Sequence, residues 1–231
     1  RWSAEMIFKR FFVSCLVVSL LLVGSAGSAG QPAGRRVPTV DDLLLLKSEG
    51  AARISPDGRW VAYTVTETNF KDDAFVTQIW LVDSTGEGPG VQLTRGSKSS
   101  GNPQWSPDGK WLAFTSDRAG DRSQIFVIRP DGGEAIQLTK SETPVANFDW
   151  SEDGKTIAYV AGEPQTKAAK DRKEHYGDFQ VVRKDYTFAH LWTFDFADAL
   201  KEPVTGRQRT KGRDFNVGGF AWSPDSTRIA F

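Results

Sequence analysis

His175 and His190 are the two imidazoles in this sequence, and an imidazole is the side chain best suited to move a proton near neutral pH. Placed beside a serine and a carboxylate, either one could support acyl transfer through a covalent intermediate. Neither lies in a recognisable catalytic motif. No serine occupies a Gly-x-Ser-x-Gly turn, since the nearest candidates fail that spacing: Ser25, Ser28 and Ser97. We therefore expect both histidines to be surface or packing residues and identify no catalytic residue.

Metal and cofactor chemistry has no sequence support either. The His-Glu-x-x-His spacing of zinc enzymes, a phosphate-binding Gly-Lys-Ser/Thr loop and a calcium-binding ladder of carboxylates are all absent. The acidic pairs Asp41-Asp42 and Asp72-Asp73 fit a helix start and a loop. We expect no metal and no cofactor, and the sequence leaves the substrate-binding residues unidentified.

The elements that would position any site are predicted by internal repetition. A ten-residue pattern, with a Ser-Pro-Asp-Gly-like turn between apolar segments, begins near residues 54, 105, 150 and 222. Proline, aspartate and glycine suit the second, third and fourth positions of a β-turn, so the flanking segments are predicted to be hairpin strands. Each second strand carries a small residue between larger ones: Ala62, Ala113, Ala158 and Ala230. Such strands are apolar on both faces, as expected when one sheet stacks between two others.

A second unit recurs between these copies. Residues 78–83 match 124–129, with 190–195 as a looser third copy, and each is followed by a turn and a short strand near 92–94, 137–139 and 208–210. One period therefore holds about four strands in roughly 45–50 residues, the size of a propeller blade. The predicted fold class is all-β, an incomplete β-propeller of about four blades with WD40-like repeats over residues 51–231.

Two segments fall outside the repeats. Residues 38–50 are predicted to form one helix, capped by Thr39 with Asp42 and stopped by Gly50, whose leucines pack on a propeller face or on another domain. The third period is 27 residues longer than the second, with the excess at about 161–188. A long insertion of this kind is either a functional loop or a solvated one.

Residues 1–5 precede the only methionine, Met6, and are expected to be translated from upstream of the true start. The rest of residues 1–30 has the organisation of an export signal. A basic stretch at 6–10 precedes the apolar run 11–23 and small residues at 24–30. Thirteen residues span about 20 Å of helix, less than the roughly 30 Å hydrocarbon core, so no stable membrane span is expected after cleavage. Cys15, the single cysteine, lies inside this run, which leaves none for a disulfide or a thiol nucleophile. We expect a periplasmic or secreted protein.

Composition excludes other classes. Lys+Arg and Asp+Glu both number 29, so the net charge of zero gives no indication of a nucleic acid or an anionic membrane as partner. A hydrophobic content of 39% with eight tryptophans is too high for a disordered chain.

The repeat resembles that of TolB-like propellers and of the propeller in the prolyl oligopeptidase family. Val40-Asp-Asp-Leu-Leu44 ahead of the first repeat narrows the resemblance, as do 176–183 and His190-Leu-Trp192. Together these residues are similar to the N-terminal part of bacterial dipeptidyl aminopeptidases and acylaminoacyl peptidases. The resemblance covers about residues 38–231.

That resemblance implies a propeller that limits access to a C-terminal α/β-hydrolase domain, whose Ser, Asp and His cleave short peptides. No triad position exists in this chain, so none is assigned, and we expect an N-terminal fragment of a longer exported serine peptidase. Its partner would be a peptide bound through the missing hydrolase domain. The alternative is a non-catalytic, protein-binding periplasmic propeller of the TolB type, although TolB proteins carry an α/β domain ahead of the propeller.

Overall fold

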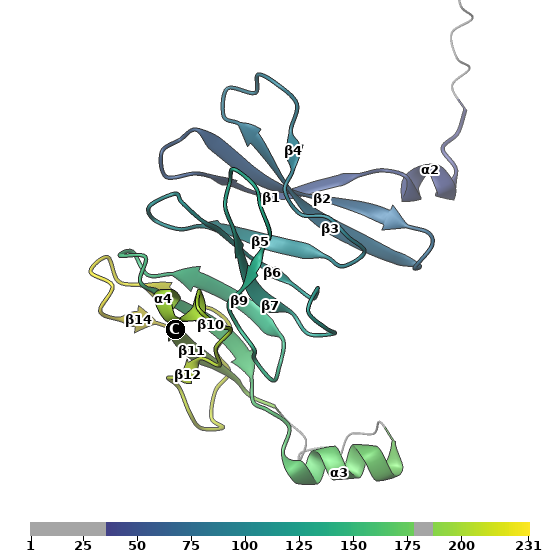
Figure 1. Ribbon diagram of the computed structural model, residues 1–231. Helices are drawn as coiled ribbons and strands as arrows, with labels where there is room; N and C mark the ends of the chain where they lie inside the picture. Colours follow the sequence, from purple (N-terminus) through teal and green to yellow (C-terminus); the bar gives the residue numbers. More distant parts are fainter. Residues whose placement is uncertain (1–35, 178–186) are drawn as a thin grey trace, which may run out of the picture. The chain divides into compact units, whose positions relative to one another are not determined.

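The computed structural model describes residues 36–177 and 187–231 (Figure 1). The chain forms two compact units, residues 1–43 and 44–231, and the second contains all the sheets. Within the described residues there are three four-stranded antiparallel sheets and one two-stranded sheet, which confirms the all-β propeller class. The predicted signal at 1–30 lies outside the described residues.

Each four-stranded sheet is one blade, and its strands pair in chain order. The first blade consists of β1 (Ser48–Ile54), β2 (Trp60–Asn69), β3 (Ala74–Asp83) and β4 (Val91–Gln92). The second consists of β5 (Ser100–Trp105), β6 (Leu112–Ser116), β7 (Gln124–Ile128) and β8 (Ile136–Gln137). The third consists of β9 (Val145–Trp150), β10 (Thr156–Gly162), β11 (Ala189–Asp195) and β12 (Arg207–Gln208). The pair β13 (Ala221–Trp222) and β14 (Ile229–Ala230) begins a fourth.

The repeated turn joins the first two strands of every blade, as predicted. In the first copy, the Gly58 N–H donates to the Ser55 carbonyl at 2.9 Å, and Gly58 has a φ of 73° that favours glycine. The Ser55 side chain closes the loop, because its hydroxyl contacts Asp57 and accepts a hydrogen bond from the Trp60 N–H at 2.9 Å. Equivalent bonds recur in the turns that begin at Ser106, Ser151 and Ser223.

Successive blades pack face to face through the alternation of side chains along each strand. On β6, Leu112 and Phe114 are buried against the Ala62, Ile79 and Leu81 side of the first blade. Ala113 points the other way, into the cluster that contains Tyr159 of the third blade. The second blade is thus apolar on both faces because it lies between two others, as the sequence predicts.

The predicted helix at 38–50 is wrong in extent. Helix α2 covers Val40–Leu44, and its start has the expected cap, with the Asp42 N–H donating to the Thr39 hydroxyl at 3.3 Å. Ser48–Gly50 instead pair with β2, where backbone hydrogen bonds to a neighbouring strand outweigh local helix preference. Gly50 is part of that strand and stops no helix, and Leu45 and Leu46 are exposed and so are not packed on a propeller face.

The insertion, expected to be a loop, contains a helix. Helix α3 covers Lys167–Tyr176, and Thr166 caps it by accepting a hydrogen bond from the Ala169 N–H at 3.2 Å. None of its residues is buried. A short helix, α4 (Phe196–Ala199), follows β11 and was also not predicted.

Candidate functional site

The two histidines lie in different environments. His175 is exposed on α3, where its ring meets that of Tyr176 at 5.4 Å between centroids. His190 is fully buried on β11. The structure does not bring them together, and His190 is the one that belongs to a polar cluster.

His190 occupies a position that the repeats define. In the first blade, the Thr94 hydroxyl accepts from the Ile79 N–H at 2.9 Å and donates to the Gln78 side chain at 2.7 Å. In the second blade, Thr139 makes the same two bonds, at 2.9 Å to the Ile125 N–H and at 2.8 Å to Gln124. In the third blade the threonine is Thr210 and the amide is replaced by an imidazole, that of His190.

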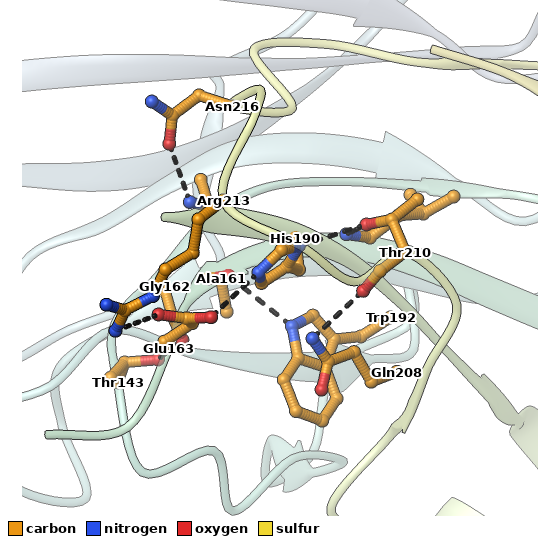
Figure 2. Close-up of polar contacts among 12 residues, drawn as sticks. Thr143, Ala161, Gly162, Glu163, His190, Trp192, Gln208, Thr210, Arg213 and Asn216 are labelled. Atoms are coloured by element: carbon orange, nitrogen blue, oxygen red, sulfur yellow. Dashed lines mark hydrogen bonds and ion pairs between the residues drawn. The ribbon is translucent and has the colours of Figure 1, made fainter. Parts of the chain in front are cut away.

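The third blade keeps the threonine bonds and adds an acidic partner. The Thr210 hydroxyl accepts from the Leu191 N–H at 3.0 Å and lies 3.3 Å from His190 Nδ1. His190 Nε2 lies 3.2 Å from Glu163 Oε1, and Arg213 Nη2 lies 3.7 Å from Glu163 Oε2 (Figure 2). A chain of hydroxyl, imidazole, carboxylate and guanidinium results.

The hydrogen-bond pattern assigns the imidazole tautomer. By analogy with Thr94 and Thr139, the Thr210 O–H donates to the ring, so His190 Nδ1 accepts. Nε2 then carries the proton and donates to Glu163, an assignment from the network of partners. With this tautomer, both ring nitrogens of His190 have a hydrogen-bond partner.

The order of hydroxyl, imidazole and carboxylate is that of a nucleophilic triad, but the surroundings do not suit catalysis. Thr210 is 7% exposed and His190 is 0% exposed, so no substrate carbonyl can approach the hydroxyl. The hydroxyl also accepts the Leu191 N–H, as its equivalents do in the other two blades. The cluster therefore fixes β11 to the following loop, which agrees with the packing role expected for His190.

Glu163 also marks the base of the insertion, because it follows the last residue of β10. Its N–H donates to the Phe188 carbonyl at 2.9 Å, which joins the two ends of the insertion. The Thr143 hydroxyl donates to the Gly162 carbonyl at 2.7 Å, and the Ala189 N–H donates to Asn216 at 2.8 Å (Figure 2). Hydrogen bonds therefore hold both strands from which the insertion extends, β10 and β11, at the points where it begins and ends.

Sequence reasoning missed Glu163 and Arg213. Both lie in loops. They come close to His190 only because the segment after β12 folds back toward the end of β10. The match of 190–195 to the two earlier copies does place His190 at the position of Gln78 and Gln124, which is the signal for its packing role.

Other site types have no support in the described residues. In residues 36–177 and 187–231, His, Cys, Asp and Glu side chains do not form a group of three that could hold a metal. The same residues contain no helix that is both long and apolar enough to cross a membrane. Most of the 176–183 motif that supported the family resemblance lies outside the described residues.

A family model described as the TolB beta propeller domain matches residues 45–187. The chain is 38% identical over 100 residues to an uncharacterized peptidase of Bacillus subtilis, YuxL, covering 43% of this chain and 15% of the relative. It is 34% identical over 131 residues to dipeptidyl-peptidase 5 of Porphyromonas endodontalis, covering 54% of this chain and 19% of that protein. The chain thus spans less than a fifth of the length of either peptidase.

A solved structure shows the same fold. The acylaminoacyl peptidase of Pyrococcus horikoshii superposes with a TM-score of 0.55 at 15% identity, covering 77% of this chain and 26% of the peptidase chain. At 15% identity, this similarity is evidence of a shared fold only.

Proposed function

Because the chain belongs to the TolB β-propeller domain family, we propose that it is the propeller portion of an exported serine peptidase that hydrolyses oligopeptides. In such a protein, the propeller controls which peptides reach a catalytic Ser, Asp and His in an α/β-hydrolase domain outside this chain. The only hydroxyl, imidazole and carboxylate that meet in the described residues are those of Thr210, His190 and Glu163, and they are buried in a blade.

One observation carries this proposal. Both curated relatives described above are named as peptidases, and they match this chain at 38% identity over 100 residues and 34% over 131 residues. Fold likeness alone would not separate a peptidase propeller from other propellers, because one fold serves many functions.

A second function has support from the family description itself. The matching model is the TolB propeller, so a non-catalytic propeller that binds other proteins is the alternative. The two proposals differ in whether the protein that contains this chain has a reactive serine.

The test is active-site labelling of the natural gene product. The full open reading frame that includes these residues should be expressed and treated with a fluorophosphonate, alongside the 231-residue chain. We expect labelling of the full product and none of the chain alone. A full product that stays unlabelled and cleaves no peptide, while it captures a protein partner, would favour the TolB-like alternative.

Export is part of the proposal and rests on the basic and apolar stretches within residues 1–30. Fractionation of cells that express the complete gene would test it. We expect the mature protein outside the cytoplasm, with its N-terminus among or just after the small residues at 24–30.

A further inference from the structure

One charged position recurs in all three blades, four residues after the aromatic residue that ends each repeat. It is occupied by Glu67, Arg118 and Glu163 in turn. Glu67 pairs with Lys47 Nζ at 2.7 Å, and Glu163 pairs with His190 and Arg213. Arg118 forms no ion pair with any described carboxylate. Of the three charged side chains at this position, that of Arg118 therefore has no ion-pair partner among the described residues.

A comparison among arginines gives the same result. Three described arginines lie over aromatic rings, and two of them also have an acidic partner. Arg129 lies over Trp111 at 5.6 Å and meets Asp131 at 3.2 Å, while Arg213 lies over Phe188 at 6.0 Å and meets Glu163. Arg118 lies 5.2 Å from the Phe114 ring centroid and 5.5 Å from that of Phe126, without such a partner.

The Arg118 guanidinium is nevertheless held in place. Its Nη2 donates to the Ser100 hydroxyl at 2.9 Å and its Nε donates to the Ser116 hydroxyl at 3.3 Å. Both serines are buried, and Phe114 and Phe126 stack on each other at 5.9 Å beneath it. Partial burial against these groups lowers the pKa of Arg118, because loss of water disfavours the charge.

Two hydrogen bonds leave part of the guanidinium free to bind. A guanidinium has five N–H donors, and the two bonds to serine use Nε and one N–H of Nη2. The remaining donors, on Nη1 and Nη2, form the end-on fork that matches the two oxygens of a carboxylate. Arg118 as a whole is exposed, so a ligand can reach this fork.

The acidic residues closest to Arg118 in the sequence do not fill this fork. Asp117 Oδ2 lies 3.9 Å from Lys98 Nζ and Asp121 Oδ1 lies 3.7 Å from the same amine. Both carboxylates therefore lie within ion-pair distance of Lys98 and neither of Arg118, so the Arg118 fork has no acidic partner among the described residues.

We propose that Arg118, oriented by Ser100 and Ser116, is a binding site for a carboxylate group of a peptide. The carboxylate preference comes from the geometry of the fork, and the choice of a peptide as its bearer rests on the proposed function. Two sources share this chemistry, the C-terminus of a peptide and an acidic side chain.

The experiment compares matched peptides on the 231-residue chain, with the Arg118 side-chain Nε–H signal followed by NMR. The probes are an acetylated trialanine with a free C-terminus, its C-terminal amide, and an amidated acetyl-Ala-Glu-Ala. We expect the signal to shift with the carboxylate peptides and not with the amidated trialanine. The two carboxylate probes show which source binds more tightly.

Variants identify the residue responsible. R118Q should weaken carboxylate binding roughly tenfold or more, as expected for loss of a charged hydrogen-bonding partner. R118K should give an intermediate affinity, since it keeps the charge and loses the fork. R129Q is the matched control, an arginine on an aromatic ring that already has an acid, and it should bind as the wild type does.

Equal binding of the free-acid and amidated trialanine peptides by the wild type would overturn the proposal, as would unchanged binding by a folded R118Q. The wild-type comparison needs no variant, so it decides the question even if R118Q unfolds. Loss of the Arg118 proposal would leave the peptidase proposal standing whenever the full gene product is labelled by fluorophosphonate.

Discussion

The Tyr159 hydroxyl accepts a hydrogen bond from the Gly206 N–H at 3.1 Å, and the ring lies so close that a Cβ on Gly206 would be 2.6 Å from Tyr159 Cε1. The first blade repeats this relationship, since a Cβ on Gly90 would lie 2.7 Å from the Tyr63 hydroxyl. The second blade has phenylalanine and alanine at the two positions, Phe114 and Ala135, packed in one cluster. A tyrosine at the first position is therefore paired with glycine at the second, and a phenylalanine with alanine. The reason is that the tyrosine hydroxyl occupies the space that the alanine methyl group would need.

Exchanging these residues in the third blade tests that coupling. Gly206→Ala should lower the free energy of unfolding by about 1–3 kcal/mol through overpacking, and Tyr159→Phe by about 1 kcal/mol through the lost hydrogen bond. The double variant recreates the pair of the second blade and should lose less than the sum of the two, by about 1 kcal/mol. Urea unfolding followed by tryptophan fluorescence measures all three, and strict additivity would contradict the explanation.

The buried imidazole should be replaceable by the amide that the other blades use. His190→Gln keeps a partner for Thr210 and should cost about 1 kcal/mol or less. His190→Ala leaves a cavity and removes one partner each from Thr210 and Glu163, so it should cost about 2–4 kcal/mol. The same urea experiment applies, and a glutamine variant as unstable as the alanine variant would mean that the link to Glu163 outweighs the link to Thr210.

Acid should weaken the repeated turns through their aspartates. The Ser151 hydroxyl, with the Lys155 N–H, holds the pKa of Asp153 below its ordinary value of 3.8, and Asp57 and Asp225 have the same arrangement with Ser55 and Ser223. A folded-state pKa below the unfolded value means that the unfolded chain binds more protons as the pH falls. The stability from each turn is therefore fully present above the unfolded pKa and is lost as the pH falls through the folded one.

Unfolding measured between pH 5 and pH 2.5 should show this loss. In Ser151→Ala the pKa of Asp153 moves back toward 3.8, so the variant should lose less stability on acidification than the wild type, whatever its stability at pH 7. Ser151→Thr keeps the hydroxyl and should follow the wild type. A steeper acid loss in the alanine variant would show that the serine does not control this carboxylate.

The sequence alone determined the features that depend on local pattern. The Ser-Pro-Asp-Gly turns, the alternation around Ala113 and the three copies of the third strand follow from residue type and spacing, because a tight turn and a two-residue period are local properties. The absence of a nucleophile motif was also visible in the sequence.

Only the tertiary structure decided the features that depend on distant segments. Ser48–Gly50 became strand because β2 was available to pair with them, which no helix signal around Thr39 could reveal. The links from His190 to Glu163 and Arg213 join residues separated by an insertion and a loop. The free fork of Arg118 is recognised only when the partners of Glu67 and Glu163 are known, because an unpaired charge is defined by what surrounds it in space.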